Sequence, residues 1–197
     1  MKYVFLLLLM LIIACREDSN SRGYSLYSQG VKHLNRFYET RDSSELLLAK
    51  KNVEKADRID PQGRNSRFAC RLSILSLLKK YKDGIVLVSS VDSSMFVLPY
   101  QKNLYLKTFR ALQAKVEQDT LNERKYLEEI IVEIELYMKN NTISLETLSD
   151  LYYTKLRLVG KNKVITELES KRALHDECAN YYNTLMTTIS CIDTLDL

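Results

Sequence analysis

Residues 42–61 read DSSELLLAKKNVEKADRIDP, and they predict one amphipathic helix together with both of its ends. The small and aliphatic residues of this segment recur every three or four positions and therefore share one face of a helix. These residues are Leu46, Ala49, Val53 and Ala56. Asp42-Ser-Ser-Glu45 matches a capping-box variant, which starts a helix, and Pro61 disfavours helical backbone at the residue before it. The helix is therefore expected to begin after Asp42 and to end near Ile59.

The same spacing recurs on both sides of this segment and predicts further helices. The stripes are Tyr27-Val31-Leu34-Tyr38, Phe68-Leu72-Leu75-Leu78, Tyr105-Phe109-Leu112-Val116 and Leu127-Ile131-Ile134-Met138. A broken stripe from Ile165 to Ile192 predicts either one long helix or two helices with a bend near Ala173. The 197 residues include five Gly and two Pro, which leaves few residues for the tight turns of an all-β fold. We therefore expect an all-α protein.

Turn and capping residues predict where several of these helices begin and end. Gly84 suits a helix C-cap or a tight turn. Ile85–Val88 is an uninterrupted apolar run that fits a buried strand or a short helix, and the lack of a second strand signal nearby favours the helix. Thr120-Leu-Asn-Glu123 matches a capping box, and Ser144 is an N-cap candidate for a helix that extends to Gly160.

The pattern Ala49-x-x-x-Val53-x-x-Ala56-x-x-Ile59-Asp60-Pro61 resembles the second helix of a tetratricopeptide repeat. Gly30 and Leu34 are candidates for the first helix of that repeat, and Tyr81-x-x-Gly84 is similar to the turn of a second repeat. The resemblance implies antiparallel helical hairpins stacked as a short α-solenoid. Residues 39–44 are an insertion relative to the repeat, and the chain lacks a regular period of about 34 residues. An irregular helical bundle is therefore the alternative fold.

The chain begins with a short apolar segment that includes LLLLMLIIAC at residues 6–15. Lys2 precedes the segment, and the charged residues Arg16–Asp18 follow it. A membrane-spanning helix needs about 20 apolar residues, so the run from Tyr3 to Ala14 is too short to span. A positive start, an apolar core and a small residue at its end predict a secretory signal peptide.

The end of this segment, Ile12-Ile13-Ala14-Cys15, resembles the lipobox of bacterial lipoproteins. The resemblance implies a diacylglyceryl group on the Cys15 sulfur, cleavage after Ala14, and acylation of the new amino group by a fatty acid such as palmitate. Two or more chains anchor a protein stably without spanning the membrane. We therefore expect a signal peptide at 1–14, a lipidated Cys15 with a flexible tether at 15–22, and a helical-repeat domain at 23–197. The alternative is an ordinary signal peptide whose Cys15 remains a thiol.

The residues after Cys15 indicate where in the cell envelope the protein is expected to lie. Arg16-Glu17-Asp18 resembles a basic-then-acidic signal for export to the outer face of the outer membrane. The alternative interpretation is a solvated linker, since Glu-Asp-Ser-Asn-Ser is typical of disordered tethers. Position 16 is not Asp, so the familiar signal for inner-membrane retention is missing. The sequence predicts a cell-envelope protein anchored in the outer membrane.

The net charge and the cysteine content limit which kinds of ligand are expected. Removal of residues 1–14 would lower the net charge from +4 to +3, because Lys2 is the one charged residue lost, and this mild charge does not demand a nucleic acid. Besides Cys15 the chain has Cys70, Cys178 and Cys191, an odd number that cannot all pair within one chain. It has no Cys-x-x-Cys and no His-x-x-x-His, so we expect no metal and no cofactor.

Catalytic motifs are missing from the sequence. It has no Gly-rich phosphate loop, no Gly-x-Ser-x-Gly and no His-Glu-x-x-His, so we do not expect an enzyme. Several carboxylates beside an apolar stripe are interpreted as its solvated face rather than as a catalytic acid and base. These are Glu128, Glu129, Glu133 and Glu135.

Candidate binding residues come from a basic stretch and from paired tyrosines. Arg64, Arg67 and Arg71 belong to a cationic segment that is either a solvated surface or a docking site for anionic lipid headgroups or acidic partners. Tyr153 and Tyr182 each lie about 100° around a helix from a core tyrosine, so they are expected to be exposed and to contact a partner. We expect a scaffold that binds an envelope protein through a helical-repeat surface. The alternatives are a glycan-binding accessory lipoprotein and, third, an enzyme with a deep pocket.

Overall fold

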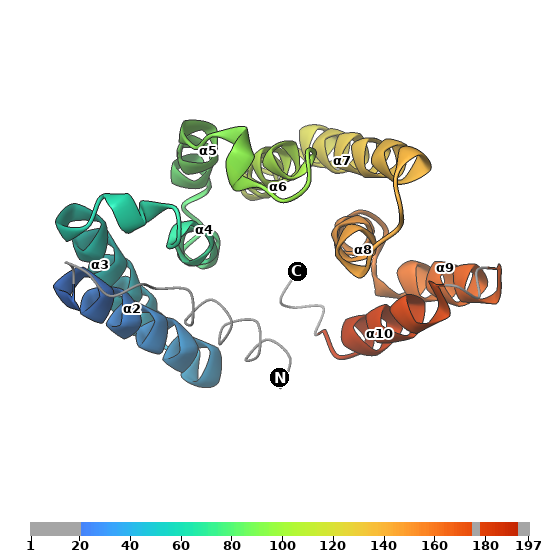
Figure 1. The fold of residues 1–197 in the computed structure, drawn as a ribbon. Helices are drawn as coiled ribbons and strands as arrows, with labels where there is room; N and C mark the ends of the chain where they lie inside the picture. Colours follow the sequence, from blue (N-terminus) through green and yellow to red (C-terminus); the bar gives the residue numbers. More distant parts are fainter. Residues whose placement is uncertain (1–20, 175–177, 193–197) are drawn as a thin grey trace. The chain divides into compact units, whose positions relative to one another are not determined.

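A computed structural model describes residues 21–174 and 178–192, and these residues form a series of helices without a strand (Figure 1). The prediction of an all-α protein is therefore confirmed. The lipobox, Cys15 and all of the signal peptide lie outside the described residues. The helix α2 (Ser21–Thr40) already includes Ser21 and Arg22, which the sequence had placed in the tether. Among the described residues, no helix is both long enough and apolar enough to cross a membrane.

The helices gather in two compact units, whereas the sequence suggested one domain from residue 23 onward. Unit 1 ends at Leu78 and unit 2 begins at Lys79. Unit 1 contains α2, α3 (Ser43–Ile59), the 3₁₀ turn η1 (Gln62–Arg64) and α4 (Phe68–Leu77). Unit 2 contains α5 (Tyr81–Ser90), η2 (Ser93–Met95), α6 (Gln101–Val116), α7 (Thr120–Asn140), α8 (Leu145–Val159), α9 (Lys161–Leu174) and α10 (Ala179–Ser190).

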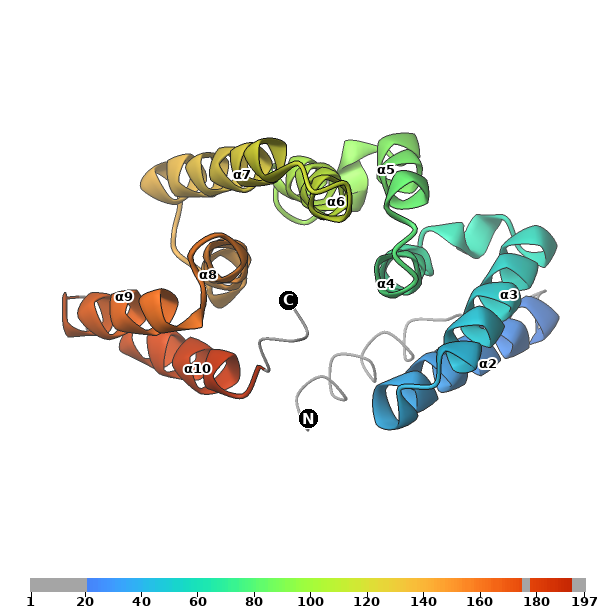
Figure 2. The same cartoon turned by 180° about the vertical axis from the view of Figure 1, so that it is seen from behind.

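In unit 1, α2 and α3 pack side by side as a helical hairpin (Figures 1 and 2). The predicted stripe of α3 is buried at all four positions, with Ala49 and Ala56 fully enclosed. Gly30 makes the close approach possible, because a Cβ atom there would lie 2.7 Å from Val53 Cγ2 and 3.2 Å from the Ala49 carbonyl oxygen. On α2 the predicted stripe is wrong at Tyr38, which is 50% exposed, and Phe37 packs against the core instead.

The ends of α3 follow the sequence with one difference. Asp42 is the N-cap, and its carboxylate accepts a hydrogen bond from the Ser44 backbone N–H at 2.8 Å. The reciprocal half of the capping box does not form, because Glu45 Oε2 lies 2.5 Å from His33 Nδ1 on α2. This pair links the two helices of the hairpin. The helix ends at Ile59, before Asp60-Pro61, as expected.

The segment around Gly84 differs from the expectation. Helix α4 ends at Leu77, and the chain then turns through Lys79, which has a φ of 55°. Gly84 does not cap a helix; it lies in the first turns of α5, where its missing side chain leaves room for the Phe109 ring. Ile85–Val88 is helical, which confirms the choice of a helix over a strand.

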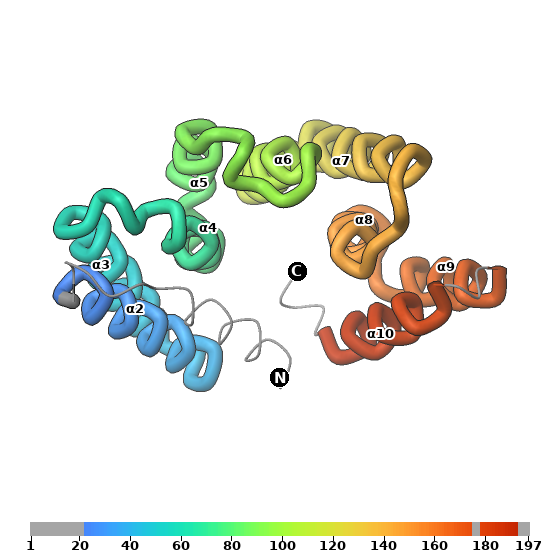
Figure 3. The backbone as a smooth tube through the Cα atoms, in the orientation of Figure 1, coloured from blue at the N-terminus to red at the C-terminus, as the bar shows by residue number. Residues whose placement is uncertain are grey.

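In unit 2 each helix from α5 to α10 packs against the next one along the chain (Figure 3). The predicted stripe of α6 is only partly correct. Phe109 is buried, but Tyr105 and Val116 are 36% and 61% exposed, and Leu104 and Ala111 are buried in their place. The reason is that α6 lies between α5 and α7 and is covered from two sides, so its buried positions do not form a single stripe.

The remaining helices of unit 2 can be compared with the helix ends that the sequence predicts. Helix α7 is capped by Asp119, whose carboxylate accepts from the Asn122 N–H at 3.1 Å, so the predicted capping box at Thr120 is wrong by one residue. Ser144 caps α8 as predicted, and Gly160 ends it with a φ of 84°. The broken stripe after Gly160 forms two helices, α9 and α10.

Candidate functional site

Helix α8 presents one narrow exposed stripe in unit 2. It packs against α7, α9 and α10, and six of its 15 residues are buried. Four polar or aromatic residues remain on its accessible side, spaced by four, three and four positions, so they share one face of the helix. These residues are Glu146, Asp150, Tyr153 and Arg157. The stripe therefore runs from two carboxylates through a phenol to a guanidinium.

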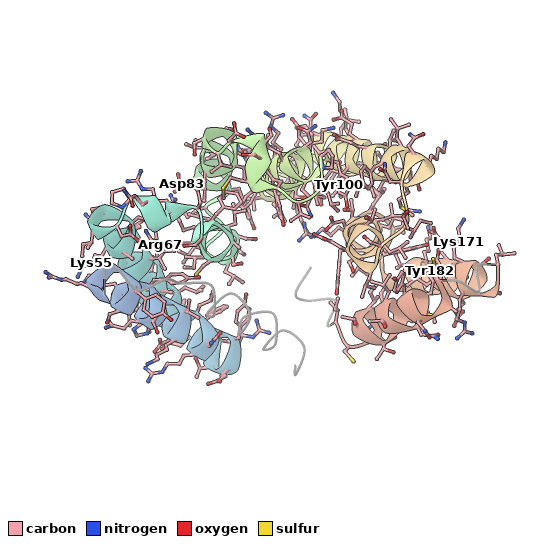
Figure 4. The ribbon with its side chains drawn as sticks, viewed as in Figure 1. Lys55, Arg67, Asp83, Tyr100, Lys171 and Tyr182 are labelled. Atoms are coloured by element: carbon pink, nitrogen blue, oxygen red, sulfur yellow. The ribbon has the colours of Figure 1, made fainter. Side chains whose placement is uncertain are left out.

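The start of α6 holds the acidic end of this stripe. The Tyr100 hydroxyl donates a hydrogen bond to Asp150 Oδ2 at 3.0 Å. Gln101 Nε2 donates to Glu146 Oε1 at 2.7 Å, and Gln101 Oε1 accepts from the Leu98 backbone N–H at 3.1 Å. Tyr100 and Gln101 are themselves buried, so the two carboxylates are fixed by neutral donors that cannot easily move (Figure 4 labels Tyr100).

The carboxylate of Asp150 is electrostatically unusual. Burial, together with the nearby charge of Glu146, raises the pKa of Asp150 to about 6, against the opposing effect of the hydrogen bonds from Tyr100 and Gln101. Burial and the charge of Asp150 in turn raise the pKa of Tyr100, so this phenol remains a hydrogen-bond donor at physiological pH. The pair forms a polar contact between α6 and α8 that is half shielded from water.

Aromatic rings border the stripe on the α6 side. The Tyr105 ring lies 5.8 Å from the Phe96 ring, with an angle of 37° between the ring planes. Burial raises the pKa of Tyr105, and the charges of Asp150 and Glu146 raise it further, which places this phenol within electrostatic reach of the stripe. Tyr105 nevertheless keeps 36% of its surface exposed. An incoming ligand would therefore meet an accessible ring beside two carboxylates.

The basic end of the stripe is Arg157. Its surface is accessible, yet surrounding protein lowers the pKa of its guanidinium through desolvation, and the Tyr81 hydroxyl acts in the opposite direction. Tyr81 also packs on Phe109, with ring centroids 6.3 Å apart. We call the accessible set Glu146, Asp150, Tyr153, Arg157, Tyr105 and Tyr81 the α6–α8 face.

The two predicted tyrosines behave differently. Tyr153 is 37% exposed and belongs to the α6–α8 face, and partial burial raises its pKa. Tyr182 is only 3% exposed, so the expectation that it is available to a partner is wrong (Figure 4). Its ring contacts the Tyr152 ring edge-on at 6.5 Å, where α10 packs against α8. Of the neighbours Tyr181 and Tyr182, Tyr181 is the more exposed, because α10 is rotated by one residue position from the orientation that the sequence predicted.

The three predicted arginines do not form one docking surface. Arg67 is 3% exposed; its Nε lies 2.7 Å from Asp57 Oδ1 and its Nη1 lies 3.1 Å from Asp60 Oδ2. Arg71 Nε lies 3.2 Å from Asp57 Oδ2, whereas Arg64 is exposed. Asp57 lies on the buried side of α3 and needs a counter-ion there. The expectation that Arg67 is a surface contact is therefore wrong, and its role is structural.

The predicted solvated carboxylates of α7 form ion pairs. Lys107 Nζ lies 3.2 Å from Glu129 Oε2 and 3.4 Å from Glu133 Oε2. Arg124 Nε lies 2.7 Å from Glu128 Oε1. These ion pairs join α6 to α7 or stabilise α7 itself.

Cysteine pairing and metal binding can be assessed within the described residues of both units. Within residues 21–174 and 178–192, no disulfide joins Cys70, Cys178 or Cys191, and no group of three His, Cys, Asp or Glu side chains is arranged to hold a metal. Burial raises the pKa of Cys70 to about 11, so this thiol is protonated at neutral pH. The expected lack of a cofactor stays a prediction.

Sequence reasoning identified Tyr153 but missed the rest of the α6–α8 face. The signal for the α8 part was available, since residues 146, 150, 153 and 157 lie opposite the apolar residues at helical spacing. The contribution of Tyr105 could not be found in this way, because its stripe was assigned to the core. Comparisons of the chain with protein-family models, with curated proteins and with solved structures gave no match.

Proposed function

We propose that this chain is a lipid-anchored protein of the cell envelope that binds another protein through the α6–α8 face of unit 2. The anchor is the part of the proposal that rests on sequence, namely the lipobox Ile12-Ile13-Ala14-Cys15. Diacylglyceryl and acyl chains on Cys15 would hold the helices at a membrane, in this proposal the outer membrane. The proposal gives the chain a scaffolding role and no reaction of its own.

The observation that carries the binding role is the combination of accessible aromatic rings with fixed charges on one face. Tyr105 and Tyr153 are each more than one-third exposed. Tyrosine and arginine dominate the energetics of protein interfaces, because they offer a large rigid contact area with polar ends. Asp150 is already oriented by the Tyr100 hydroxyl. The face therefore offers an ordered contact surface that loses little side-chain freedom when a partner binds.

The charge order along α8 indicates what kind of segment fits. Asp150 and Arg157 are seven residues apart, which corresponds to about 10 Å along a helix. A partner segment with a cation at one end and an anion at the other, and with an apolar or aromatic residue between them, would complement this order. A peptide or a protein loop can supply such a segment.

The partner-binding role is tested by co-purification from membranes with the anchor intact. We expect an envelope protein to co-purify with the wild-type chain and to be lost from the double variant Tyr105→Ala/Tyr153→Ala. The matched control is Tyr24→Ala in unit 1, whose side chain is 45% exposed. Equal recovery with both variants would remove the α6–α8 face from the proposal, provided that circular dichroism shows both variants folded.

The anchor is tested separately. The variant Cys15→Ser should no longer incorporate labelled palmitate and should leave the membrane fraction. A variant that is still processed and still membrane-bound would contradict the lipobox assignment. This result would not affect the binding test on unit 2, because the two experiments alter different parts of the chain.

A surface glycan is the second candidate ligand, and the observation that favours it is the Phe96–Tyr105 ring pair beside Asp150. Sugar rings stack on exposed aromatics while a carboxylate accepts hydrogen bonds from their hydroxyls. The charges of Glu146 and Arg157 on the same face favour a protein instead. Binding of purified envelope polysaccharide to the wild-type chain, lost in Tyr105→Ala, would favour the glycan over the protein partner.

A further inference from the structure

The outward side of α3 in unit 1 is both basic and aliphatic. It lies opposite the buried stripe of this helix, and it exposes Leu47 by 60% and Leu48 by 40%. Three cations share this side, and a fourth follows in η1. They are Lys51, Lys55, Arg58 and Arg64. We call these six residues the α3 basic face.

The cations of this face are not neutralised within the protein. In the part of the chain that the structure describes, Lys51, Lys55, Arg58 and Arg64 form no ion pair. The nearby carboxylates pair with other cations. Glu54 Oε1 lies 3.5 Å from Lys50 Nζ, and Asp57 forms ion pairs with Arg67 and Arg71. Figure 4 shows the Lys55 side chain extending away from the helices of unit 1. The buried ion network thus removes the local anions and leaves the surface cations unmatched.

The charge of the chain is concentrated in the same unit. Residues 21–78 contain 11 Lys and Arg against six Asp and Glu, a net charge of +5. Residues 79–197 contain 16 Lys and Arg against 17 Asp and Glu, a net charge of −1. The mild charge of the whole chain therefore conceals a basic unit that follows the proposed anchor and a nearly neutral unit that carries the α6–α8 face.

We infer that the α3 basic face lies against an anionic phospholipid bilayer. This inference rests on the proposed anchor for one point, the distance to the membrane. Five residues lie between Cys15 and Ser21, and the six Cα-to-Cα steps from one to the other span at most about 20 Å when fully extended. Unit 1 is then held within a short distance of the lipid headgroups, where unmatched cations are attracted to anionic lipids and Leu47 and Leu48 can enter the interface.

The geometry of the side chains suits a bilayer surface. Lysine and arginine can rest their aliphatic stems on an apolar surface while their charged ends reach the phosphates. A helix that lies in the plane of a membrane interface inserts apolar side chains such as leucine and pairs its Lys and Arg with anionic headgroups. An acidic protein would match the charges equally well, but it would not be brought close by the tether. The lipid anchor and the α3 basic face would together orient unit 1 on the membrane.

The test uses residues 15–197 with Cys15→Ser, which retain every described helix and carry no lipid. Sedimentation with vesicles of phosphatidylethanolamine and phosphatidylglycerol measures binding, and vesicles of phosphatidylethanolamine and phosphatidylcholine serve as the neutral reference. We expect binding to the anionic vesicles that falls steeply with added salt. The variant Lys51→Gln/Lys55→Gln/Arg58→Gln should partition about a hundredfold more weakly, since each of the three cations contributes roughly a fivefold change near an anionic surface.

The matched control removes the same charge from unit 2. Lys125→Gln/Lys163→Gln/Lys171→Gln alters three exposed lysines on α7 and α9, and it should bind the anionic vesicles like the wild type (Figure 4 labels Lys171). A third variant, Leu47→Ser/Leu48→Ser, keeps every charge and should weaken binding severalfold, which a purely electrostatic attraction would not do. All variants are checked by circular dichroism.

Three outcomes would overturn the inference. The first is equal binding to anionic and neutral vesicles, and the second is an equal loss of binding in the α3 and the control variants. The third is unchanged vesicle binding by the α3 variant together with loss of an acidic protein on co-purification, which would assign the face to a protein. Failure of the anchor is recognised independently by palmitate labelling, and failure of the α6–α8 face by Tyr105→Ala/Tyr153→Ala, which should leave vesicle binding intact.

Discussion

The two units stabilise charge in different ways. Unit 1 buries an ionic network, in which Arg67 is 3% exposed and Asp57 is 6% exposed. Unit 2 keeps its ion pairs nearer the surface: Lys155 Nζ lies 2.7 Å from Glu167 and 3.2 Å from Glu135, and its side chain is 15% exposed. The interior of unit 2 is a large apolar cluster, whereas the core cluster of the α2–α3 hairpin is much smaller. Unit 1 therefore depends on a few charged contacts and unit 2 on many apolar ones.

This difference has a consequence for function. In unit 1 the arginines nearest the core have a structural role, and only those farther out are available to a membrane or a partner. In unit 2 the apolar core leaves charged and aromatic residues available on one side of α8. The basic stretch in the sequence of unit 1 thus contains more cations than the surface makes available. The apolar stripes of unit 2, in turn, suggest fewer accessible aromatic side chains than the structure has.

The largest effect is expected for Arg67→Met. Removing the guanidinium leaves Asp57 buried without its principal counter-ion, which should lower the free energy of unfolding by about 3–5 kcal/mol. Urea unfolding followed by circular dichroism measures the loss. Arg64→Met, at an exposed position, should change stability by less than about 0.5 kcal/mol. Hydrogen exchange would show whether protection falls only in α2–α4; an equal fall in α6–α10 would mean that the two units unfold together.

A smaller effect is expected where α2 and α3 touch. Gly30→Val should lower the free energy of unfolding by about 1–3 kcal/mol, because the new side chain would overlap Val53 and the α3 backbone. Gln29→Val introduces the same residue at the neighbouring exposed position and controls for helix propensity. If both variants lost the same stability, close packing at Gly30 would not be what holds the hairpin together.

In unit 2 the acidic end of the α6–α8 face should be sensitive to pH. Burial raises the pKa of Asp150 to about 6, whereas an aspartate in an unfolded chain titrates near ~3.9. Between these values the folded protein binds more protons than the unfolded chain, so this group's contribution to stability is present below pH ~4 and is lost as pH rises through about 6.

Asp150→Asn tests this pH dependence, since an amide oxygen can still accept the hydrogen bond from Tyr100. The variant should have a flatter stability profile between pH 4 and pH 7, and at pH 7.5 it should be about 1 kcal/mol more stable than the wild type, a value reduced for partial solvent exposure. Asp83→Asn, at an exposed position on α5, should keep the wild-type slope (Figure 4 labels Asp83). A parallel slope in the Asp150 variant would assign the pH dependence to other groups.

The smallest effects are expected for exposed ion pairs within single helices, one in each unit. Lys50→Gln removes a pair with Glu54 at 3.5 Å, and Arg124→Gln removes a pair with Glu128 at 2.7 Å. Each change should cost less than about 0.5 kcal/mol, because exposed pairs one helical turn apart are screened by water. A large loss from Lys50→Gln would show that the surface charges of unit 1 matter as much as its buried network.

The sequence by itself determined the helical class, the ends of α3 and α8, and the core side of α3. The spacing of Leu46, Ala49, Val53 and Ala56, the cap at Asp42 and the stop before Pro61 all act within a few residues of the chain. Such local interactions do not need a neighbouring helix to be interpreted. The same holds for Ser144 and Gly160 at the ends of α8.

Only the tertiary structure decided which side chains are available on the surface. Tyr181 and Tyr182 are adjacent in sequence, and the packing of α10 on α8 buries one and leaves the other exposed. Tyr105 became accessible because α5 and α7 cover α6 from two sides, and Arg67 became buried because Asp57 faces inward. Each outcome depends on a partner at least ten residues away in the chain, and helical periodicity carries no information about where that partner lies.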